Sequence, residues 1–310
     1  MRICMEIDKP SVSILLAVYK PNETWLIEQL ISLNDQTYKN LELLIYDDCP
    51  NFPVSEEYFK KHITNFRYKL MRGRKNQGSN IAFEELTKMA CGDFLAYCDQ
   101  DDIWEKNKIE FLVRVITKEK SVMVYSDVSV IDKDSKLIAK TLKEVRPRLK
   151  YVHGEKLFST LFFNNCIAGC CMLVKSELAK KAMPFSKVTI HDHWIAIIAS
   201  FYGSVAFFNK PLVKYRIHGN NQTGILSNVF SKEDYYNVRL IPLRQRMDEI
   251  RECIKDVDLK DIIKFYKARI DKNIFKILRY RHLSKKEAYF EILMIFIPNW
   301  LFKNIIKKLK

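Results

Sequence analysis

Three carboxylates, Asp99, Asp101 and Asp102, stand within four positions directly after an apolar run at residues 94–97. Such a run is typical of a short buried strand. If the backbone stays extended, Asp99 and Asp101 project from the same side, because strand side chains alternate. Two anions facing one point repel each other unless a proton or a cation intervenes, and oxygen ligands suit Mg²⁺ or Mn²⁺. The alternative is an acidic turn in which Asp101 or Asp102 caps a helix that starts near Trp104.

A basic, glycine-containing loop at residues 72–80 is a second candidate for ligand binding. Its Arg and Lys side chains, its backbone N–H groups and the N-terminus of a following helix could together hold a diphosphate. Basic solvated turns are common, so an ordinary surface loop is the alternative. The patterns Gly-x-Gly-x-x-Gly and Gly-x-x-x-x-Gly-Lys are absent, so neither a dehydrogenase nor a P-loop ATPase is favoured.

The elements that must position these groups alternate between strand and helix. Residues 11–19 are nearly all apolar, which is typical of a central strand covered on both faces. Asn22 can cap the helix that follows, and a second strand at residues 41–46 ends in Asp47 and Asp48. This alternation predicts an α/β domain with a Rossmann-like mixed, mostly parallel sheet flanked by helices. In such sheets ligands bind at the carboxyl ends of the strands. One face of the first helix carries Leu26, Leu30 and Leu33.

The composition limits the class of protein. The chain has 310 residues, 48% of them hydrophobic, with a net charge of +15 and a pI near 9.3, so anionic partners are favoured. Base-stacking aromatics interleaved with Lys and Arg do not gather into a module, so no nucleic-acid partner is expected. The eight cysteines form no Cys-x-x-Cys pair, which indicates a reducing cytosol. Residues 1–10 are too polar for a signal peptide, and no run reaches the roughly eighteen apolar residues of a membrane span.

Several short motifs follow one another along this chain. They are the strand at residues 12–19, Asp35-Gln36-Thr37-Tyr38, Asp47-Asp48, Asn76-Gln77-Gly78, Gly92-Asp93 and the segment 99–104. Their order and spacing resemble glycosyltransferase family two, and most closely its bacterial rhamnosyltransferase-like branch, over about residues 11–224. The resemblance implies a GT-A fold and a metal-dependent, inverting transfer from a UDP- or dTDP-linked sugar.

Carried over residue by residue, the resemblance implies a donor site. Tyr19 would stack on the nucleobase, Asp48 would accept a hydrogen bond from the pyrimidine, and Asp99 would contact the ribose or the diphosphate. This chain has Cys49 and Pro50 where the family usually has Gly-Ser, so the shape of that loop departs from the family pattern. The expected donor-binding residues are Ala17, Tyr19, Asp48, Asn76, Gly78, Asp99 and Arg216.

The resemblance also implies a divalent cation, Mn²⁺ or Mg²⁺. Asp101, the last carboxylate of the Asp-x-Asp motif, would bind the metal that bridges the two phosphates. His218, in the segment 213–221, would be a further ligand, and an imidazole beside carboxylates favours Mn²⁺. Arg216 in the same segment would either neutralise phosphate charge or pair with an acid.

The acceptor side is expected in the second half of the chain. Residues 164–174 resemble the glycine-containing strand beneath the acceptor, where Gly169 would permit close approach; an ordinary bulge or bend is the alternative. Residues 189–194 resemble the acidic motif of the family at the mouth of a helix. Asp192 is therefore expected to be the general base that takes the proton of the acceptor hydroxyl. A helix N-cap between two surface histidines is the alternative at Asp192.

The expected domain organisation has three parts. Residues 1–10 form a tail and residues 11–224 form the glycosyltransferase domain, with a nucleotide-binding half at 11–104 and an acceptor half at 105–224. Residues 225–310 form a basic helical region.

Helical periodicity in this basic region predicts helices at residues 261–280 and 285–309, the latter interrupted at Pro298. Basic amphipathic helices can lie on an anionic membrane surface, with Trp300 and Phe302 as interfacial anchors. The alternative is a helical bundle packed on the domain, with a homodimer interface.

The expected protein is cytoplasmic, peripheral at the inner face of the bacterial plasma membrane. It would transfer a sugar to a saccharide or lipid-linked saccharide acceptor in surface polysaccharide assembly. We expect transfer of one sugar per binding event rather than processive synthesis, because the Gln-x-x-Arg-Trp motif of processive synthases is absent. The alternative function is a catalytically inactive nucleotide-sugar-binding or membrane-surface scaffold protein.

Overall fold

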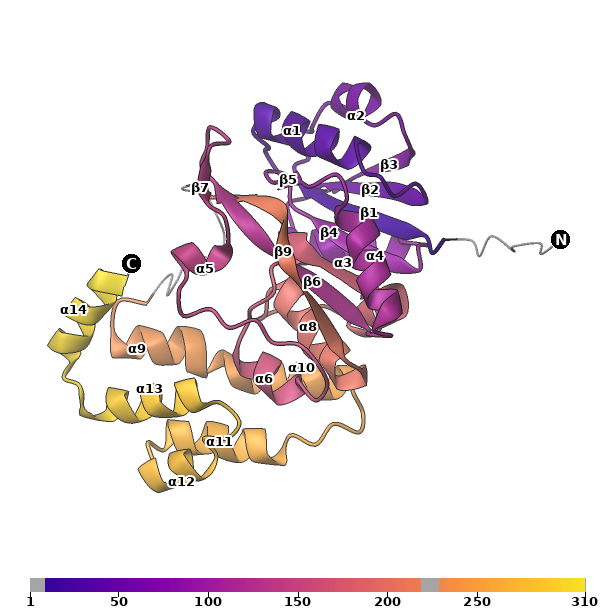
Figure 1. The fold of residues 1–310 in the computed structure, drawn as a ribbon. Coiled ribbons are helices and arrows are strands. Elements are labelled where there is room, and N and C mark those ends of the chain that lie inside the picture. Colours follow the sequence, from indigo (N-terminus) through magenta and orange to yellow (C-terminus); the bar gives the residue numbers. More distant parts are fainter. Residues whose placement is uncertain (1–8, 219–228, 310) are drawn as a thin grey trace. The chain divides into compact units, whose positions relative to one another are not determined.

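A computed structural model describes residues 9–218 and 229–309 of the chain (Figure 1). The predicted boundary at residue 224 and most of the predicted tail at residues 1–10 lie outside these described residues. The chain forms two compact units that interleave in the sequence. The first unit comprises Met1–Leu157, Cys166–Phe185 and Ile190–His218, and the second comprises Phe158–Asn165, Ser186–Thr189 and Gly219–Lys310. Among the described residues, two short segments of the predicted glycosyltransferase domain, 158–165 and 186–189, therefore belong to the second unit.

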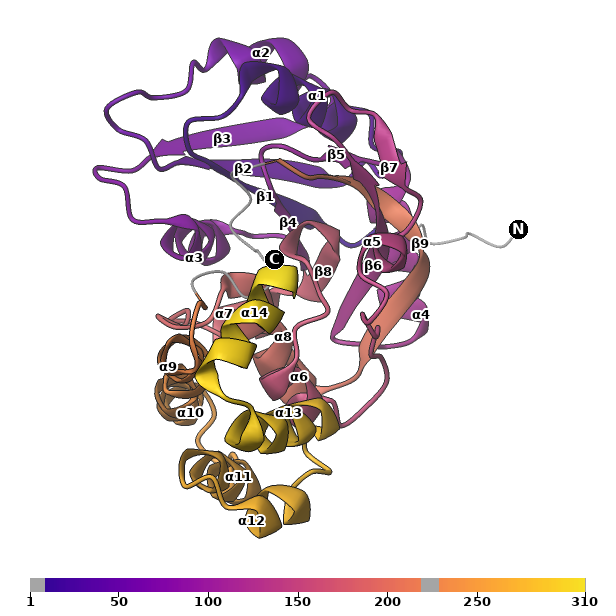
Figure 2. The same ribbon diagram turned by 90° about the vertical axis from the view of Figure 1, so that its left-hand side faces the viewer.

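The first unit is built on a nine-stranded mixed sheet with the order β3-β2-β1-β4-β8-β6-β9-β5, and β7 pairs with β6 (Figure 2). Among the described residues, β1 to β4, β6 and β9 run in one direction and β5, β7 and β8 run in the other. This agrees with the predicted mixed, mostly parallel sheet. The strands are β1 (Val12–Val18), β2 (Leu41–Asp47), β3 (Arg67–Arg72), β4 (Phe94–Cys98), β5 (Ile103–Trp104), β6 (Met123–Ile131), β7 (Leu137–Ala139), β8 (Met172–Lys175) and β9 (Val205–Arg216).

Helices flank this sheet on both faces. Figures 1 and 2 show α1 and α2 on one face of β1 to β3 and α3 on the other. Helices α7 and α8 contact α3, and α4 packs on β6 and β9. The helices of this unit are α1 (Glu23–Asn34), α2 (Glu57–His62), α3 (Ser79–Met89), α4 (Lys108–Lys118), α5 (Leu142–Val145), η1 (Gly169–Cys171), α7 (Ser176–Lys181) and α8 (His191–Tyr202).

Burial of the strands follows from their apolar runs. Every residue of β4 and β6 is buried, and β1 is buried except at Ala17. Asn22 caps α1 as predicted, since its side chain accepts the N–H of Trp25. The parallel strands end at one edge of the sheet, so the residues that directly follow β1, β2, β3, β4 and β9 lie along that edge.

The second unit is helical. The predicted single helix at residues 261–280 is two helices, because Asn273 caps a new one by accepting the N–H of Lys276. The predicted helix at 285–309 is broken at Pro298, as expected. No helix in the described part of the chain is both long and apolar enough to span a bilayer. The helices are α6 (Phe158–Phe163), α9 (Lys232–Tyr235), η2 (Tyr236–Leu240), α10 (Pro242–Cys253), α11 (Lys260–Ile270), α12 (Ile274–Arg279), α13 (Lys285–Phe296) and α14 (Asn299–Leu309).

Candidate active site

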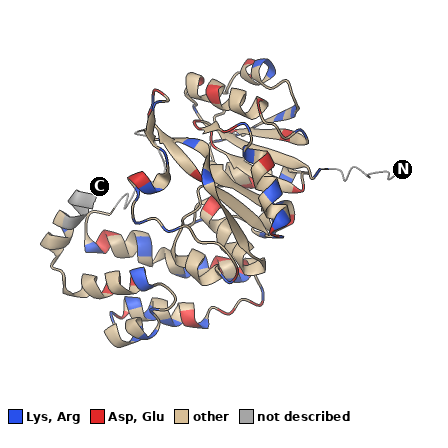
Figure 3. Cartoon of the chain, in the orientation of Figure 1, with Lys and Arg blue, Asp and Glu red and all other residues tan. Residues whose placement is uncertain are grey.

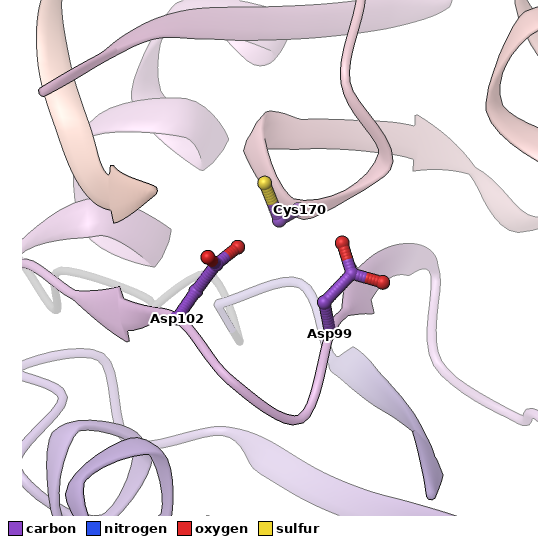
Figure 4. A group of neighbouring side chains, drawn as sticks. All are labelled: Asp99, Asp102 and Cys170. Atoms are coloured by element: carbon purple, nitrogen blue, oxygen red, sulfur yellow. The ribbon is translucent and has the colours of Figure 1, made fainter. Parts of the chain in front are cut away.

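The acidic segment turns where the sequence suggested an extended strand. β4 ends at Cys98 and the chain reverses, so Asp99 and Asp102 stand at the two ends of a turn. Both carboxylates face Cys170 (Figure 4), and one ligand atom of each of the three residues lies within 4.8 Å of the others. The expectation that Asp99 and Asp101 project together from an extended segment is therefore wrong.

The side chain of Gln100 explains this turn. Its Oε1 accepts the backbone N–H of Tyr19 (2.8 Å), and its Nε2 donates to the carbonyl of Tyr19 (3.1 Å). The acidic turn is thereby joined to the loop after β1. Tyr19 itself is 41% exposed at the end of β1, and Ala17 lies two residues before it, in the strand. An exposed ring at this edge is available for stacking on a ligand.

Asp102 is a structural acid of the turn. Its Oδ1 accepts the backbone N–H of Arg216 (2.9 Å), and its carboxylate is buried. The alternative that Asp101 or Asp102 caps a helix near Trp104 is wrong, because Trp104 lies in β5 and α4 starts only at Lys108.

Crowding and burial shift the pKa values of the acidic turn. Burial, followed by the charges of Asp102, Asp101 and Asp192, raises the pKa of Asp99 well above its usual value. Burial and then Asp101 raise the pKa of Asp102 to about 7. Burial also keeps the Cys170 thiol protonated by raising its pKa well above the usual value. Such a thiol is a poor ligand for a hard cation, so the trio in Figure 4 does not by itself suit Mg²⁺ or Mn²⁺.

A buried lysine lies beneath this turn. The ammonium of Lys108 donates to the carbonyl of Cys170 (2.7 Å) and stands 2.9 Å from the centre of the Trp104 ring. Burial lowers the pKa of Lys108 to about 8. Its charge lowers the pKa of both Asp99 and Asp102, partly offsetting their mutual repulsion.

Arg216 is fully buried and pairs with an acid, the second of the two expectations for this residue. Its guanidinium donates to Glu28 (2.6 Å) and to the carbonyl of Asp101 (2.7 Å). It also donates to the carbonyl of Asp132 (3.1 Å) and to the Ser135 hydroxyl (2.8 Å). Arg216 therefore clamps the acidic turn between α1 and the β6–β7 hairpin.

Asp101 and His218 meet at this edge of the sheet. Oδ2 of Asp101 lies 2.8 Å from Nε2 of His218, and both side chains remain partly accessible. Adjacent ligands about 2.1 Å from one cation would be about 3 Å apart, so these atoms could share a divalent metal. The Trp25 ring packs on the imidazole, with ring centres 4.8 Å apart, and its indole N–H donates to the carbonyl of Lys133 (3.0 Å). A carboxylate with an imidazole suits Mn²⁺.

The loop after β3 closes on Asp48. Both carboxylate oxygens of Asp48 accept the N–H of Gln77 (3.0 Å), and Oδ2 also accepts the N–H of Gly78 (2.7 Å). Oδ1 of Asn76 accepts the same Gly78 N–H (3.1 Å). Gly78 has a φ of +85°, which favours glycine, and it directly precedes α3. The predicted diphosphate loop thus stands at a helix N-terminus, a favourable place for an anion.

Asp192 lies in the first turn of α8, and its Oδ2 accepts the N–H of Gly169 (3.0 Å). Gly169 belongs to a helical turn before β8, so both the expected strand and the alternative of an ordinary bend are wrong in detail. A Cβ at this glycine would lie 2.8 Å from Nε2 of His191, so only glycine fits without a shift. The alternative for Asp192, a helix N-cap, is wrong, because Ile190 is the cap residue and His191 already lies in the helix.

His191 is buried as well, and the alternative of two surface histidines is wrong. Its ring packs against Phe83 and Tyr97, with ring centres 4.1 Å and 5.5 Å away, and neither ring nitrogen has a hydrogen-bond partner within residues 9–218 and 229–309. Burial lowers its pKa to about 3, so the ring is neutral. Its backbone N–H donates to Oδ1 of Asn80 (2.8 Å), which ties the start of α8 to the start of α3.

Two sequence motifs hold the scaffold. The buried Gln36 side chain donates to the carbonyls of Ser32 and Glu105, both at 3.0 Å, and thereby fixes the chain beyond the acidic turn. Asp93 accepts both the N–H (2.7 Å) and the hydroxyl (2.9 Å) of Ser11, which aligns the starts of β4 and β1. The sequence did not indicate the roles of Trp25, Glu28, Gln100 and Lys108, because each of them bonds a residue far away in the sequence.

Comparisons with known proteins show the family of the chain. Residues 13–182 match the family model described as glycosyl transferase family 2. An uncharacterized glycosyltransferase of Methanocaldococcus jannaschii, MJ1057, is 28% identical over 242 residues, covering 76% of this chain and 80% of that protein. The Escherichia coli UDP-Glc:alpha-D-GlcNAc-diphosphoundecaprenol beta-1,3-glucosyltransferase WfgD is 27% identical over 229 residues, covering 71% of this chain and 81% of WfgD.

Solved structures share the fold. Staphylococcus aureus TarS in complex with UDP-GlcNAc superposes with a TM-score of 0.57 at 15% identity, over 90% of this chain and 82% of that one. Its complex with UDP gives a TM-score of 0.55 at 17% identity, over 84% of this chain and 71% of that one.

Proposed function

The chain belongs to glycosyl transferase family 2, and from that premise we propose that it catalyses an inverting, metal-dependent hexosyl transfer from a nucleoside diphosphate sugar. The acceptor is a saccharide or a lipid-linked saccharide in the assembly of a bacterial surface polysaccharide. WfgD, by its name, uses UDP-Glc and a lipid-linked acceptor, and TarS binds UDP and UDP-GlcNAc. These names favour a UDP-sugar over the dTDP-sugar that a rhamnosyltransferase-like enzyme would use.

The observation that carries this proposal is the convergence at the carboxyl edge of the sheet. Tyr19 and Asp48 follow β1 and β2, the acidic turn follows β4, and His218 follows β9. Asp192 is close enough to the turn for its charge to raise the pKa of Asp99. A nucleoside, a metal-bound diphosphate and an acceptor hydroxyl could therefore meet in one crevice.

Donor binding is assigned to the exposed part of this edge. Tyr19 stacks on the nucleobase while Ala17 leaves room beside it, and Asp48 offers its remaining lone pairs to the pyrimidine. The loop at Asn76 and Gly78, with the N-terminus of α3 behind it, receives the diphosphate. Asp99 contacts the ribose or diphosphate. Arg216 contributes indirectly, by fixing the backbone of the acidic turn.

Asp101 and His218 would hold the divalent cation, Mn²⁺ or Mg²⁺. Trp25 packs on His218 and thereby orients its imidazole. When bound, the cation would offset the negative charge that develops on the departing nucleoside diphosphate.

Asp192 is the proposed general base. An acceptor hydroxyl becomes a good nucleophile only as its proton leaves, and a positioned carboxylate can take that proton. The Gly169 N–H at 3.0 Å holds one carboxylate oxygen of Asp192 in place. The acceptor oxygen attacks the anomeric carbon from the side opposite the diphosphate, so the configuration inverts in a single displacement.

Two substitutions test these roles. Asp192→Asn should lower transfer by about 10² to 10⁴-fold, because a general base contributes about that much. Its affinity for UDP should stay that of the wild type. Asp101→Asn should raise the Mn²⁺ concentration needed for half-maximal activity. Asp248→Asn, at an exposed acid of α10, is the matched control and should change neither quantity. Wild-type turnover by Asp192→Asn with a defined acceptor would refute the assigned base.

Donor identity is testable without an acceptor. Thermal unfolding in Mn²⁺ should shift upward with a UDP-sugar more than with a dTDP-sugar, because a ligand that binds only the folded state stabilises it. A shift without any transfer or donor hydrolysis would instead support the inactive nucleotide-sugar-binding alternative.

The proposed site of action is the inner face of the plasma membrane, where a lipid-linked acceptor would be met. The protein would be peripheral there, with the basic helices of the second unit against the bilayer or in a homodimer. Support for the first arrangement comes from the exposed surface of α13.

A further inference from the structure

Helix α13 has two different apolar faces. Its inner face packs within the second unit, where Ala288 and Met294 belong to two apolar clusters with buried residues such as Phe265 and Phe302. Phe302 is only 1% exposed, so the expectation that it anchors at a membrane interface is wrong. The inner face is thus fully used by the unit itself.

The outer face of α13 is apolar as well. Tyr289, Leu293 and Phe296 are 56%, 52% and 70% exposed, and their spacings of four and three place them on one side of the helix. Trp300, at the start of α14, is 65% exposed. A surface helix normally turns charged or polar residues toward water on this side. Contiguous exposed apolar residues of this kind mark an interaction surface.

The charge around this face is positive. Residues 272–310 contain ten Lys and Arg but only two acids, Glu287 and Glu291. Both acids pair with the buried Arg269, at 3.3 Å and 2.8 Å. Neither acid is therefore free to offset the exposed lysines. Figure 3 shows basic residues recurring along these helices.

Three of these lysines continue the apolar face. Lys285 and Lys286 are exposed at the start of α13, one turn before Tyr289. Lys303 is exposed one turn after Trp300. The apolar residues are thus bordered at both ends by positive charge, which is the composition of a helix lying in the headgroup region of an anionic bilayer.

We propose that the outer face of α13, continued by Trp300, docks on an anionic lipid bilayer. Tyr289, Leu293, Phe296 and Trp300 would enter the boundary between headgroups and acyl chains, while Lys285 and Lys286 contact the anionic headgroups. A second copy of the chain fits less well, because its own α13 face would bring further positive charge against this one. Docking itself does not depend on the proposed function. Only its purpose, to bring the site to a lipid-linked acceptor, rests on that function.

The test is vesicle co-sedimentation of the full chain. Wild type should sediment with vesicles that mix phosphatidylglycerol into phosphatidylcholine, and far less with phosphatidylcholine alone. Leu293→Glu should weaken binding about tenfold, since the transfer of one half-exposed leucine is lost. Lys285→Gln with Lys286→Gln should weaken it about fivefold per lysine. Leu137→Glu is the matched control, since this leucine of β7 is 58% exposed in the first unit, and it should bind as wild type does.

Two further readouts separate the explanations. Thermal unfolding of all four proteins should match, because the replaced side chains are exposed. Vesicle binding needs no sugar transfer, so it can succeed even if the proposed reaction fails. Equal sedimentation of Leu293→Glu and wild type would overturn the proposal. A wild-type dimer that becomes a monomer in Leu293→Glu, without vesicle binding by either, would assign this face to self-association and overturn it too.

Discussion

Replacing Arg216 with Met should destabilise the first unit by about 3 kcal/mol, the lower part of the range for breaking a buried ion pair. The wild-type guanidinium is fully buried, and its loss removes the donor of the Asp101 carbonyl, whereas the Asp132 carbonyl keeps the N–H of Ser135 (3.1 Å). One unpaired buried acceptor costs about 1–3 kcal/mol. Glu28 loses its ion pair as well, but its side chain is 32% exposed, so water can solvate it and the larger penalties do not apply.

The expected measurements follow from that value. A loss of about 3 kcal/mol corresponds to a fall of roughly 6–12 °C in the thermal midpoint of a unit of this size. Since Arg216 holds the backbone of the acidic turn, the variant should also need more Mn²⁺ for half-maximal activity. Differential scanning fluorimetry and a Mn²⁺ titration of transfer give the two quantities.

Lys214→Met is the matched control, since Lys214 lies on the same strand and makes an exposed pair with Glu105 at 3.8 Å. Its effect should stay within about 1 kcal/mol. An Arg216→Met variant that kept the wild-type midpoint and raised only the KM for the donor would refute this structural role of Arg216. That result would mean that Arg216 binds the donor phosphates directly.

Three further substitutions probe the surrounding elements. Asp48→Ala removes the acceptor that closes the loop before α3, so the Kd for UDP should rise about tenfold by calorimetry, and an unchanged Kd would contradict this role. Gly169→Ala places a Cβ 2.8 Å from the His191 ring and displaces Asp192, so kcat should fall about 100-fold with little change in the donor KM. His191 has a folded-state pKa of about 3, below the usual 6.5, so below pH 6.5 the unfolded chain binds the proton first and stability falls. Urea unfolding at pH 6 and pH 5 should show a loss of up to about 1.4 kcal/mol per pH unit from this residue, and His191→Leu should remove that part of the slope.

Much of the fold could be predicted because its causes are local. The apolar runs of β1 and β4 predict buried strands, and Asn22 accepts an N–H only three residues away. A strand that ends in carboxylates predicts a site at the carboxyl edge of a parallel sheet. These patterns need no knowledge of distant partners.

The detailed site could not be predicted, because its determinants are distant in the sequence. Gln100 makes the acidic turn by bonding the backbone of Tyr19, which is 81 residues away. Arg216 is buried because Glu28, 188 residues earlier, lies where its guanidinium arrives. The sequence near Gln100 or Arg216 does not distinguish a buried structural side chain from a solvent-exposed one. The burial of Phe302 could not be predicted for the same reason. Helical periodicity shows that a helix has an apolar face, but not whether that face packs inside its own unit or faces solvent.

The start of α3 connects the two halves of the proposed reaction. Asp48 accepts the N–H of Gly78 directly before this helix, and Asn80 in its first turn accepts the N–H of His191, the neighbour of Asp192. The residue assigned to the nucleobase and the residue assigned to the acceptor proton are therefore held by one helix end, through two hydrogen bonds of 2.7 Å and 2.8 Å. Movement of the loop around a diphosphate would reach Asp192 through this helix. Because a small misplacement of a reacting group lowers the rate strongly, a loop that fits the donor would also serve to aim the base.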